Sequence, residues 1–343
     1  MTDLISDSAH RLFSQFVETS PSGTDEPVWS DALWQAVEEA GFPLALLSED
    51  EGGFGLPPSD GLDVVRIAGR KGIDAPVGDT MIANLLLARA GLPLAEGPAT
   101  MIGVDTNGQP VAPVAWGRYL QTLVLYSDSG DGTSITRINV GTAAPWKRGR
   151  NLADAPRDAL PVPAELPAES NTAAIAPGVA MALGALVRVM QIAGALEIVL
   201  EMSAAYASER VQFGRPIAKF QAIQQNLAVM AGEAAAAGAA ATMAAQALNH
   251  FNDDQSAFRL IVAAAKIRAG EASGIVAELS HQIHGAIGFS REYALHPMTR
   301  RLWSWRDEYG GEAEWAESLG ASVADLSTGG LWPAVTKAQS GLF

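Results

Sequence analysis

Residues 206–221, YASERVQFGRPIAKFQ, lie where one apolar helical pattern stops and another begins. Upstream, residues 186–202 place apolar side chains at helical spacing. Residues 213–216, Phe-Gly-Arg-Pro, break that pattern, because glycine reaches backbone angles that other residues resist and proline disfavours a helix for the residue before it. The helical period returns over residues 217–230. The stretch therefore predicts an elbow between two helices.

The tip of this elbow carries Arg210, Gln212 and backbone amides. A guanidinium beside free N–H groups is suited to an anion such as a phosphate or pyrophosphate. The alternative interpretation is a plain loop between two bundle helices with a solvated arginine. The residues by themselves leave both interpretations open.

The composition of the chain excludes several classes of function. The net charge of -15 argues against nucleic acid and anionic membranes as partners. The absence of cysteine excludes disulfides and thiolate nucleophiles. We expect no metal site from the histidine spacing, no signal peptide, and no apolar run long enough to span a bilayer. A cytoplasmic location is the expectation that follows.

The pattern along the chain predicts an α+β fold that is mostly α. Helical periodicity dominates residues 1–99, which we assign to an N-terminal helical domain. Residues 100–177 contain short β-rich runs separated by turn residues and form a reduced middle β-domain. Residues 178–343 return to helical periodicity and are expected to form a C-terminal four-helix bundle domain.

Two motifs resemble those of the acyl-CoA dehydrogenase family. The elbow is similar to that family's Arg-x-x-Phe-Gly followed by Phe-Gln, and residues 281–301, HQIHGAIGFSREYALHPMTRR, resemble its Gln-x-x-Gly-Gly-x-Gly-Phe segment. The resemblance implies FAD as the cofactor, with both motifs reaching the ADP half of a neighbouring subunit's FAD. The cofactor-binding residues that it implies are Arg210, Gln212, Phe213, Phe220, Gln221, Gln282, Ile283, His284 and Gly285.

The groups that the family needs for catalysis are missing at the matching positions. The middle region lacks the family's Thr-Glu-Pro-x-Ala-Gly-Ser-Asp flavin stretch. The family's catalytic glutamate occupies one of two positions, which here fall on Tyr309 and Gly184. A phenol with a reference pKa near 10 is a poor base for abstracting an α-proton. We therefore predict no catalytic residue in this chain, although Glu308 and Glu312 flank the first position.

This combination resembles the shorter, non-catalytic subunit of the α2β2 acyl-CoA dehydrogenases of bacterial steroid catabolism. The resemblance implies a longer partner subunit that supplies the glutamate and binds most of a bulky, steroid-derived acyl-CoA. Two alternatives stay open. One is a self-sufficient homomeric dehydrogenase whose base is Glu308 or Glu312. The other is a scaffold or binding protein of the same fold without flavin.

Overall fold

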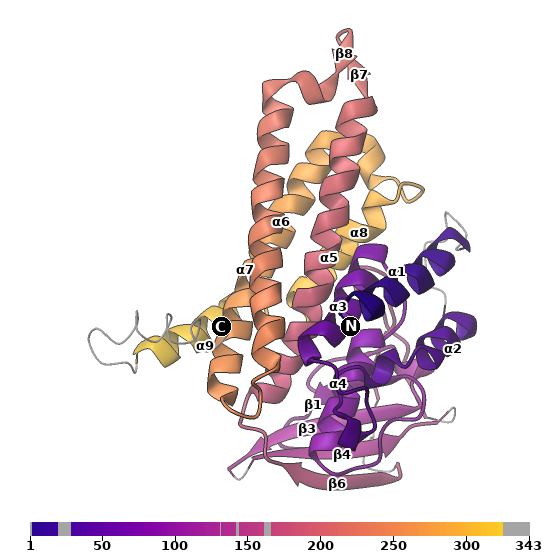
Figure 1. Cartoon of the computed structure of the whole chain (residues 1–343), viewed down its shortest axis with the longest axis vertical. Coiled ribbons are helices and arrows are strands. Elements are labelled where there is room, and N and C mark those ends of the chain that lie inside the picture. Colours follow the sequence, from indigo (N-terminus) through magenta and orange to yellow (C-terminus); the bar gives the residue numbers. More distant parts are fainter. Residues whose placement is uncertain (1, 20–28, 131, 142–143, 161–165, 325–343) are drawn as a thin grey trace.

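A computed structural model describes residues 2–19, 29–130, 132–141, 144–160 and 166–324 (Figure 1). The N-terminal part is helical and contains the short 3-10 turns η1 (Phe42–Leu44) and η2 (Glu49–Glu51). Ser30 caps the second helix by accepting a hydrogen bond from the Leu33 amide, and Gly72 ends the third helix with a left-handed φ of 64°. The helices are α1 (Thr2–Thr19), α2 (Asp31–Glu39), α3 (Pro58–Lys71) and α4 (Val77–Arg89).

Strands follow from Ala99 onward and form a four-stranded sheet in the order β1-β3-β4-β6. The β1 and β3 strands are parallel and the other pairs are antiparallel. Val124 and Ile135 on one face join the core shared with the helices, whereas Leu123 and Ile138 belong to a second core on the other face. The strands are β1 (Ala99–Gly103), β3 (Thr122–Ser129), β4 (Gly132–Asn139) and β6 (Ala168–Ala173), with a separate pair β2 (Val114–Ala115) and β5 (Arg157–Asp158).

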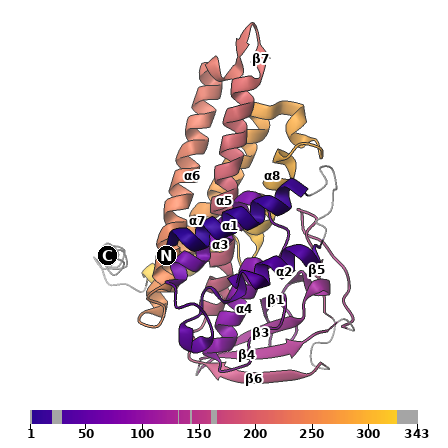
Figure 2. The same ribbon diagram turned by 45° about the vertical axis from the view of Figure 1, so that its right-hand side comes forward.

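The C-terminal part is built on two long antiparallel helices whose far ends project beyond the rest of the molecule (Figures 1 and 2). With 31 residues, α5 is about 46 Å long. The hairpin β7 (Val211–Gln212) and β8 (Arg215–Pro216), followed by the turn η5 (Ile217–Lys219), caps the projecting ends. The helices are α5 (Val179–Glu209), α6 (Gln221–Leu248), α7 (Gln255–His284), α8 (Leu295–Asp307) and α9 (Glu312–Ala324).

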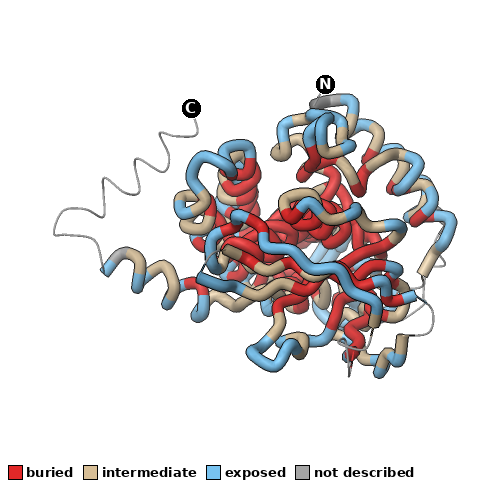
Figure 3. Tube along the Cα trace, turned by 90° about the horizontal axis from the view of Figure 1, so that it is seen from below, coloured by how far each residue is buried: buried red, intermediate tan, exposed pale blue. Residues whose placement is uncertain are grey.

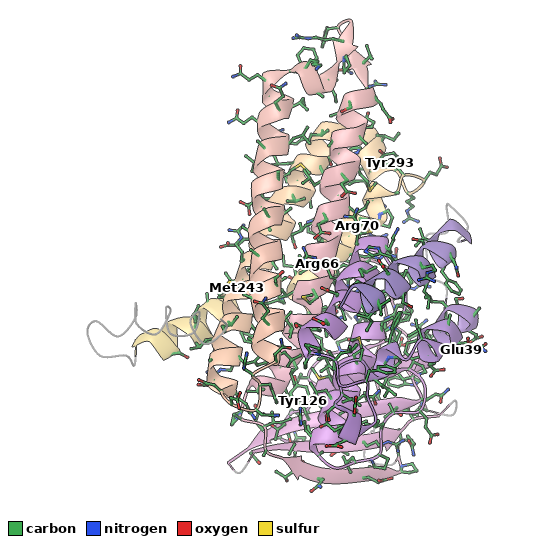
Figure 4. The ribbon with its side chains drawn as sticks, viewed as in Figure 1. Glu39, Arg66, Arg70, Tyr126, Met243 and Tyr293 are labelled. Carbon is green, nitrogen blue, oxygen red and sulfur yellow. The ribbon has the colours of Figure 1, made fainter. Side chains whose placement is uncertain are left out.

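Glycines let α3 cross α5 closely. A Cβ on Gly194 would lie 2.0 Å from the Arg66 carbonyl oxygen, so no larger residue fits without moving the backbone. Beside this crossing, Arg66 donates to Glu197 and Arg70 donates to Glu201 at 2.6 Å (Figure 4). The N-terminal helices are thereby fixed against the bundle by backbone contact and by ion pairs.

The predicted fold class, α+β and mostly α, is confirmed. Within the middle region, the run predicted at residues 111–117 forms only the two-residue strand β2. The boundaries of the three predicted domains, at residues 99/100 and 177/178, stay a prediction. The last N-terminal helix ends at Arg89, strands begin at Ala99, and α5 begins at Val179. Residues 325–343 of the predicted C-terminal domain lie outside the described residues.

The sequence predicted no apolar run long enough to span a bilayer, but two helices pass that test of length and composition. By length and composition alone, α5 and α6 could each cross a membrane. Burial explains α5, because 94% of its most apolar window lies inside the protein. Only 33% of the corresponding window of α6 is buried, so α6 presents an apolar face to the surface. Figure 3 shows the buried segments concentrated in the interior of the molecule.

Candidate functional site

The two sequence motifs meet at one place in the bundle. The Tyr206 ring at the end of α5 stacks on His284 at the end of α7, with ring centroids 4.4 Å apart. Tyr293 closes this aromatic group, 5.3 Å from His284 and 6.3 Å from Tyr206 (Figure 4). Sequence reasoning did not single out Tyr293, although it lies within the second motif. Its aromatic character in that motif was the available signal.

The elbow is a β-hairpin with a two-residue loop. Gln212 pairs with Arg215, and the loop residues Phe213 and Gly214 have φ angles of 50° and 79°. Positive φ at both loop positions is typical of a type I′ turn, which is common in hairpins but strained for a phenylalanine. Phe213 is 91% exposed and contacts the edge of Phe220, 6.1 Å away. A bulky apolar ring is thus held in solvent at the far end of the molecule.

Polar groups around the hairpin are free to bind a ligand. The guanidinium of Arg210 and the side-chain amide of Gln212 make no hydrogen bond or ion pair with any described residue. The Arg215 guanidinium lies 4.3 Å above the Phe220 ring. Residues 206–221 contain three cations and one carboxylate, within a chain whose net charge is -15. The predicted anion site is therefore locally positive, and Gln221 lies exposed beside it at the start of α6.

The second motif offers a mixture of exposed and buried residues. Gln282 is exposed and donates to Glu278, and Gly285 is exposed with no atom within 4 Å of the position a Cβ would take. Ile283 and His284 are buried. Nδ1 of His284 lies 2.8 Å from the Ser280 carbonyl oxygen, which makes Nδ1 the donor, and burial lowers the pKa of this imidazole. His284 is therefore a neutral ring that positions Tyr206 rather than a cation facing solvent.

A second cluster lies at the opposite part of the bundle, where α4, β5 and α5 meet. Arg188 is almost fully buried and donates to Asp79 at 2.7 Å and to Glu308 at 2.6 Å. The second oxygen of Glu308 accepts from Arg157 at 2.5 Å. Burial alone would raise the pKa of Glu308, but the positive charges of Arg157 and Arg188 lower it to about 2. A carboxylate held this way is a very weak base.

Tyr309 and Gly184, the residues at the two positions considered for a catalytic base, are in direct contact. The Tyr309 ring lies 2.4 Å from the point where a Cβ on Gly184 would be, so the absence of a side chain at Gly184 makes room for it. The Tyr309 hydroxyl donates to the Met101 carbonyl oxygen at 3.0 Å. Its φ of 56° is a left-handed conformation that costs a non-glycine residue energy. We call this packed pair, together with Asp79, Arg157, Arg188 and Glu308, the closed cleft.

The connection between α8 and α9 is fixed from its other side. Nζ of Lys266 donates to the carbonyl oxygens of Arg306 and Gly310 at 2.5 and 2.7 Å. Burial lowers the pKa of this lysine to about 8. Glu312 accepts from Arg306 at 2.5 Å, so its carboxylate is also engaged. Neither carboxylate that flanks Tyr309 is free to act as a base in this arrangement.

A small cavity beside the closed cleft is lined by charges that already have partners. Asp79 pairs with Arg188, Asp74 pairs with Arg301 at 2.7 Å, and Arg157 pairs with Glu308. Balanced pairs leave no net positive charge for a phosphate and no unpaired base. Among the described residues, no three histidine, aspartate or glutamate side chains gather as a possible metal site.

Comparisons with known proteins agree with this architecture. Residues 178–316 match the acyl-CoA dehydrogenase C-terminal domain family. The acyl-CoA dehydrogenase IpdE2 of Mycobacterium tuberculosis is 29% identical over 276 residues, which cover 80% of each chain. The acryloyl-CoA reductase (NADH) of Anaerotignum propionicum is 38% identical over 110 residues, or 32% of this chain and 27% of that protein.

Solved structures show the same fold over nearly the whole chain. A variant of the Tcur3481-Tcur3483 steroid ACAD superimposes with a TM-score of 0.78 at 20% identity, covering 94% of this chain and 98% of that one. A chain of the ChsE4-ChsE5 complex from Mycobacterium tuberculosis gives 0.74 at 19% identity, covering 95% and 96%. The matched bundle, in which the two motifs meet at Tyr206 and His284, therefore belongs to the acyl-CoA dehydrogenase C-terminal domain family, and the chain as a whole has the fold of the acyl-CoA dehydrogenases.

Proposed function

We propose that this chain is the non-catalytic subunit of a heteromeric, FAD-dependent acyl-CoA dehydrogenase. One observation carries the proposal: the chain presents free groups at its projecting end, while both positions for a catalytic base are filled by the Tyr309–Gly184 contact. Abstraction of an α-proton needs a carboxylate within hydrogen-bonding reach of the α-carbon. In the proposed complex, the longer subunit supplies that carboxylate.

The chemical groups at the projecting end, the hairpin and the adjoining ends of α5, α6 and α7, are of the types that bind the ADP half of FAD. A pyrophosphate is bound by free guanidinium groups and amides. Arg210 offers a free guanidinium and Gln212 a free side-chain amide, and Gly285, whose own N–H donates to the His281 carbonyl oxygen, leaves open space beside the second motif. Phe213 and Phe220 add apolar surface at the same end, and Gln221 and Gln282 add exposed amides. Ile283 and His284 contribute from beneath, by holding the second motif against Tyr206.

The closed cleft does not fit the reactive half of the same cofactor. The flavin ring takes up the β-hydrogen of the substrate as hydride when FAD is bound. Here the Tyr309 ring and the ion pairs of Arg188 fill this part of the interior. Every buried polar side-chain atom of the described closed-cleft residues has a hydrogen-bond partner within the chain, so none is left to bind a ligand. We therefore assign the flavin ring and most of the acyl-CoA to the partner.

Two further features support a heteromeric partner. Of the large apolar side chains that are exposed among the described residues, four belong to the two motif segments: Val211, Phe213, Ile287 and Phe289. The apolar face of α6 is also uncovered in the single chain. Exposed apolar side chains that gather at one end of a molecule are a feature of interaction sites and support a partner there. Similarity to a steroid ACAD supports a bulky, steroid-derived acyl-CoA as substrate of the assembled enzyme, and similarity to a chain of the ChsE4-ChsE5 complex supports a heteromeric assembly.

Co-expression with a longer acyl-CoA dehydrogenase subunit tests the proposal. The co-purified pair should be yellow, contain the two chains in equal number and reduce a dye with a steroid-derived acyl-CoA. This chain alone should be colourless. In the pair, Arg210→Ala should lower flavin occupancy at least 10-fold, whereas Arg259→Ala, a surface arginine on α7, should not change it. A yellow homomer that turns over an acyl-CoA would overturn the assignment in favour of the self-sufficient enzyme.

A scaffold without flavin is the remaining alternative, and the same preparation separates it. The pair would then form but stay colourless, and Arg210→Ala would have no effect on its absorbance.

A further inference from the structure

The small cavity beside the closed cleft has side chains on its wall that take no part in the ion pairs. Its interior has a volume of about 20 Å³, enough for one water-sized group, and it is not fully enclosed. Trp116 from the middle region, Gln191 from α5 and Trp305 from α8 line this cavity. The three residues are only 5%, 7% and 7% exposed. Three polar side chains from distant parts of the chain therefore meet at one buried space.

Each of these three side chains carries an N–H group without a partner. The indole nitrogens of Trp116 and Trp305 make no hydrogen bond with any described residue. Oε1 of Gln191 accepts from Arg188 at 2.8 Å, which turns Nε2 of the same amide away from the guanidinium. This Nε2 has no acceptor among the described residues. Buried N–H groups in proteins nearly always have an acceptor, so three without one on a single cavity indicate that another molecule supplies it.

Two other tryptophans show what distinguishes these nitrogens. Trp34 and Trp146 also carry indole nitrogens without a hydrogen bond, but both atoms are sealed from solvent by the surrounding protein. The indole nitrogens of Trp116 and Trp305 and Nε2 of Gln191 are not sealed in this way. Because only an unsealed N–H group can donate to a molecule that enters from outside, the cavity offers three usable donors, whereas Trp34 and Trp146 offer none.

A short segment of the middle region forms another part of the cavity wall and is fixed in place. Oδ1 of Asn151 accepts from the backbone amides of Ala153 and Ala155, both at 3.0 Å, and Nδ2 of Asn151 donates to Glu308 at 3.1 Å. The Ala153 amide also donates to the Ser304 hydroxyl oxygen on α8 at 3.0 Å. The wall is therefore already formed in the empty chain, and a ligand would not have to order it.

Charge and proton content decide which acceptor suits the cavity. Asp79 pairs with Arg188 and Asp74 pairs with Arg301, so an anion would lose its hydration without meeting a net positive charge. A cation would face N–H groups that only donate. A carbonyl oxygen is uncharged, accepts two hydrogen bonds and has no proton that needs an acceptor. An ordered water is the simplest structural interpretation, although its two protons would also need acceptors.

We propose that this cavity binds an uncharged small molecule through a carbonyl-type oxygen, with Trp116, Gln191 and Trp305 as the donors. The oxygen occupies the interior, and the rest of the molecule extends toward the open side. The site is separate from the projecting end, which is assigned to the ADP half of FAD. It requires neither flavin nor the longer subunit, so it goes beyond the proposed function and does not depend on it.

The indole N–H resonances of the full-length chain, labelled with ¹⁵N-tryptophan, test this inference. The probes are acetone and N,N-dimethylacetamide, which accept but do not donate hydrogen bonds, and sodium bromide as a monovalent anion. The signals of Trp116 and Trp305, assigned with Trp116→Phe and Trp305→Phe, should move and saturate with both carbonyl probes, and those of Trp34 and Trp146 should stay in place. Trp305→Phe removes one hydrogen bond and should weaken probe binding about 5-fold, as read from the Trp116 signal. Trp34→Phe, the matched control, should not weaken it.

Three results would overturn the inference. Signals of Trp116 and Trp305 that no probe moves would leave the cavity to ordered water. Signals that only bromide moves would make it an anion site. Shifts of equal size at Trp34 and Trp146 would show a solvent effect instead of a binding site. The native chain decides all three even if a variant fails to fold. Because flavin and the longer subunit are absent from these titrations, failure here leaves the proposed function standing, and a colourless complex leaves the cavity site standing.

Discussion

The closed cleft and the projecting end of the bundle use charge in opposite ways. At the closed cleft, Asp79, Arg157, Arg188 and Glu308 each have a partner within the same chain. At the projecting end, the Arg210 guanidinium has no partner among the described residues and Phe213 stands 91% exposed. Paired interior charges serve the stability of this chain. Under the proposed function, the unpaired guanidinium and the exposed ring are groups that the partner subunit and its cofactor would contact.

The largest loss of stability is expected for Arg188→Leu. The substitution leaves Asp79 and Glu308 without their shared cation, and removing one partner of a buried ion pair typically costs about 3–5 kcal/mol. Urea denaturation followed by circular dichroism should show this loss in the free energy of unfolding. Arg188→Leu combined with Asp79→Leu should recover part of it. A loss below about 1 kcal/mol, the range of exposed ion pairs, would mean that the cleft is not built on this pair.

Glu308→Gln should destabilise the chain at neutral pH by about 3 kcal/mol, because Arg157 and Arg188 hold the pKa of this carboxyl at about 2 instead of its ordinary 4.5. Since the folded-state pKa is the lower of the two, the carboxylate stabilises the fold fully above pH 4.5, and this contribution disappears as the pH falls toward 2. The difference in urea midpoint between the Glu308→Gln variant and the native chain should therefore shrink below pH 4.5. A pH-independent difference would contradict the ion-pair explanation.

Gly184→Ala tests the contact between Gly184 and the Tyr309 ring that fills the closed cleft. The new Cβ would lie 2.4 Å from the Tyr309 ring, and overpacking of this kind costs about 1–3 kcal/mol. Tyr309→Leu in the same chain should relieve the clash, which appears as a favourable coupling energy in a double-mutant cycle. Additive losses in the thermal unfolding of the two single variants and the double variant would show that the ring does not occupy this space.

The smallest effect on stability is expected for Phe213→Ser. The ring is 91% exposed, so its loss should change the free energy of unfolding by less than about 0.5 kcal/mol. The same change should weaken association with the longer subunit, as measured by analytical ultracentrifugation of the pair. Leu4→Ser, at the 71% exposed Leu4 on α1, is the matched control and should leave association unchanged.

The sequence predicted features that depend on local pattern. The break at Phe213-Gly214 is where the hairpin lies, because positive φ angles and proline act on their immediate neighbours. The assignment of Tyr309 and Gly184 to the two base positions stays a prediction, and the structure shows that these two residues are in contact in the closed cleft. Their mutual contact was beyond reach, since the two residues lie far apart in the chain and nothing local requires the tyrosine ring to turn toward α5.

Long-range pairing accounts for most of what the sequence could not reveal. Arg188 pairs with Asp79 at a sequence separation of 109 residues and with Glu308 at a separation of 120. No periodicity in the sequence predicts partners that lie so far apart in the chain. The β-rich runs of the middle region were visible in the sequence. The position of Lys147 beside β5 was not, because it depends on pairing with Ala159. Burial of His284 similarly depends on Tyr206, which arrives from another helix.

The hairpin at the end of α5 and α6 also bears on how the chain is made in the cell. The Phe213 ring is exposed to water at the end of two projecting helices, in a backbone conformation that is strained for phenylalanine. Chaperones and proteases recognise such exposed apolar groups until a partner covers them. If the proposed function is right, synthesis in step with the longer subunit would shorten the time for which this ring is exposed.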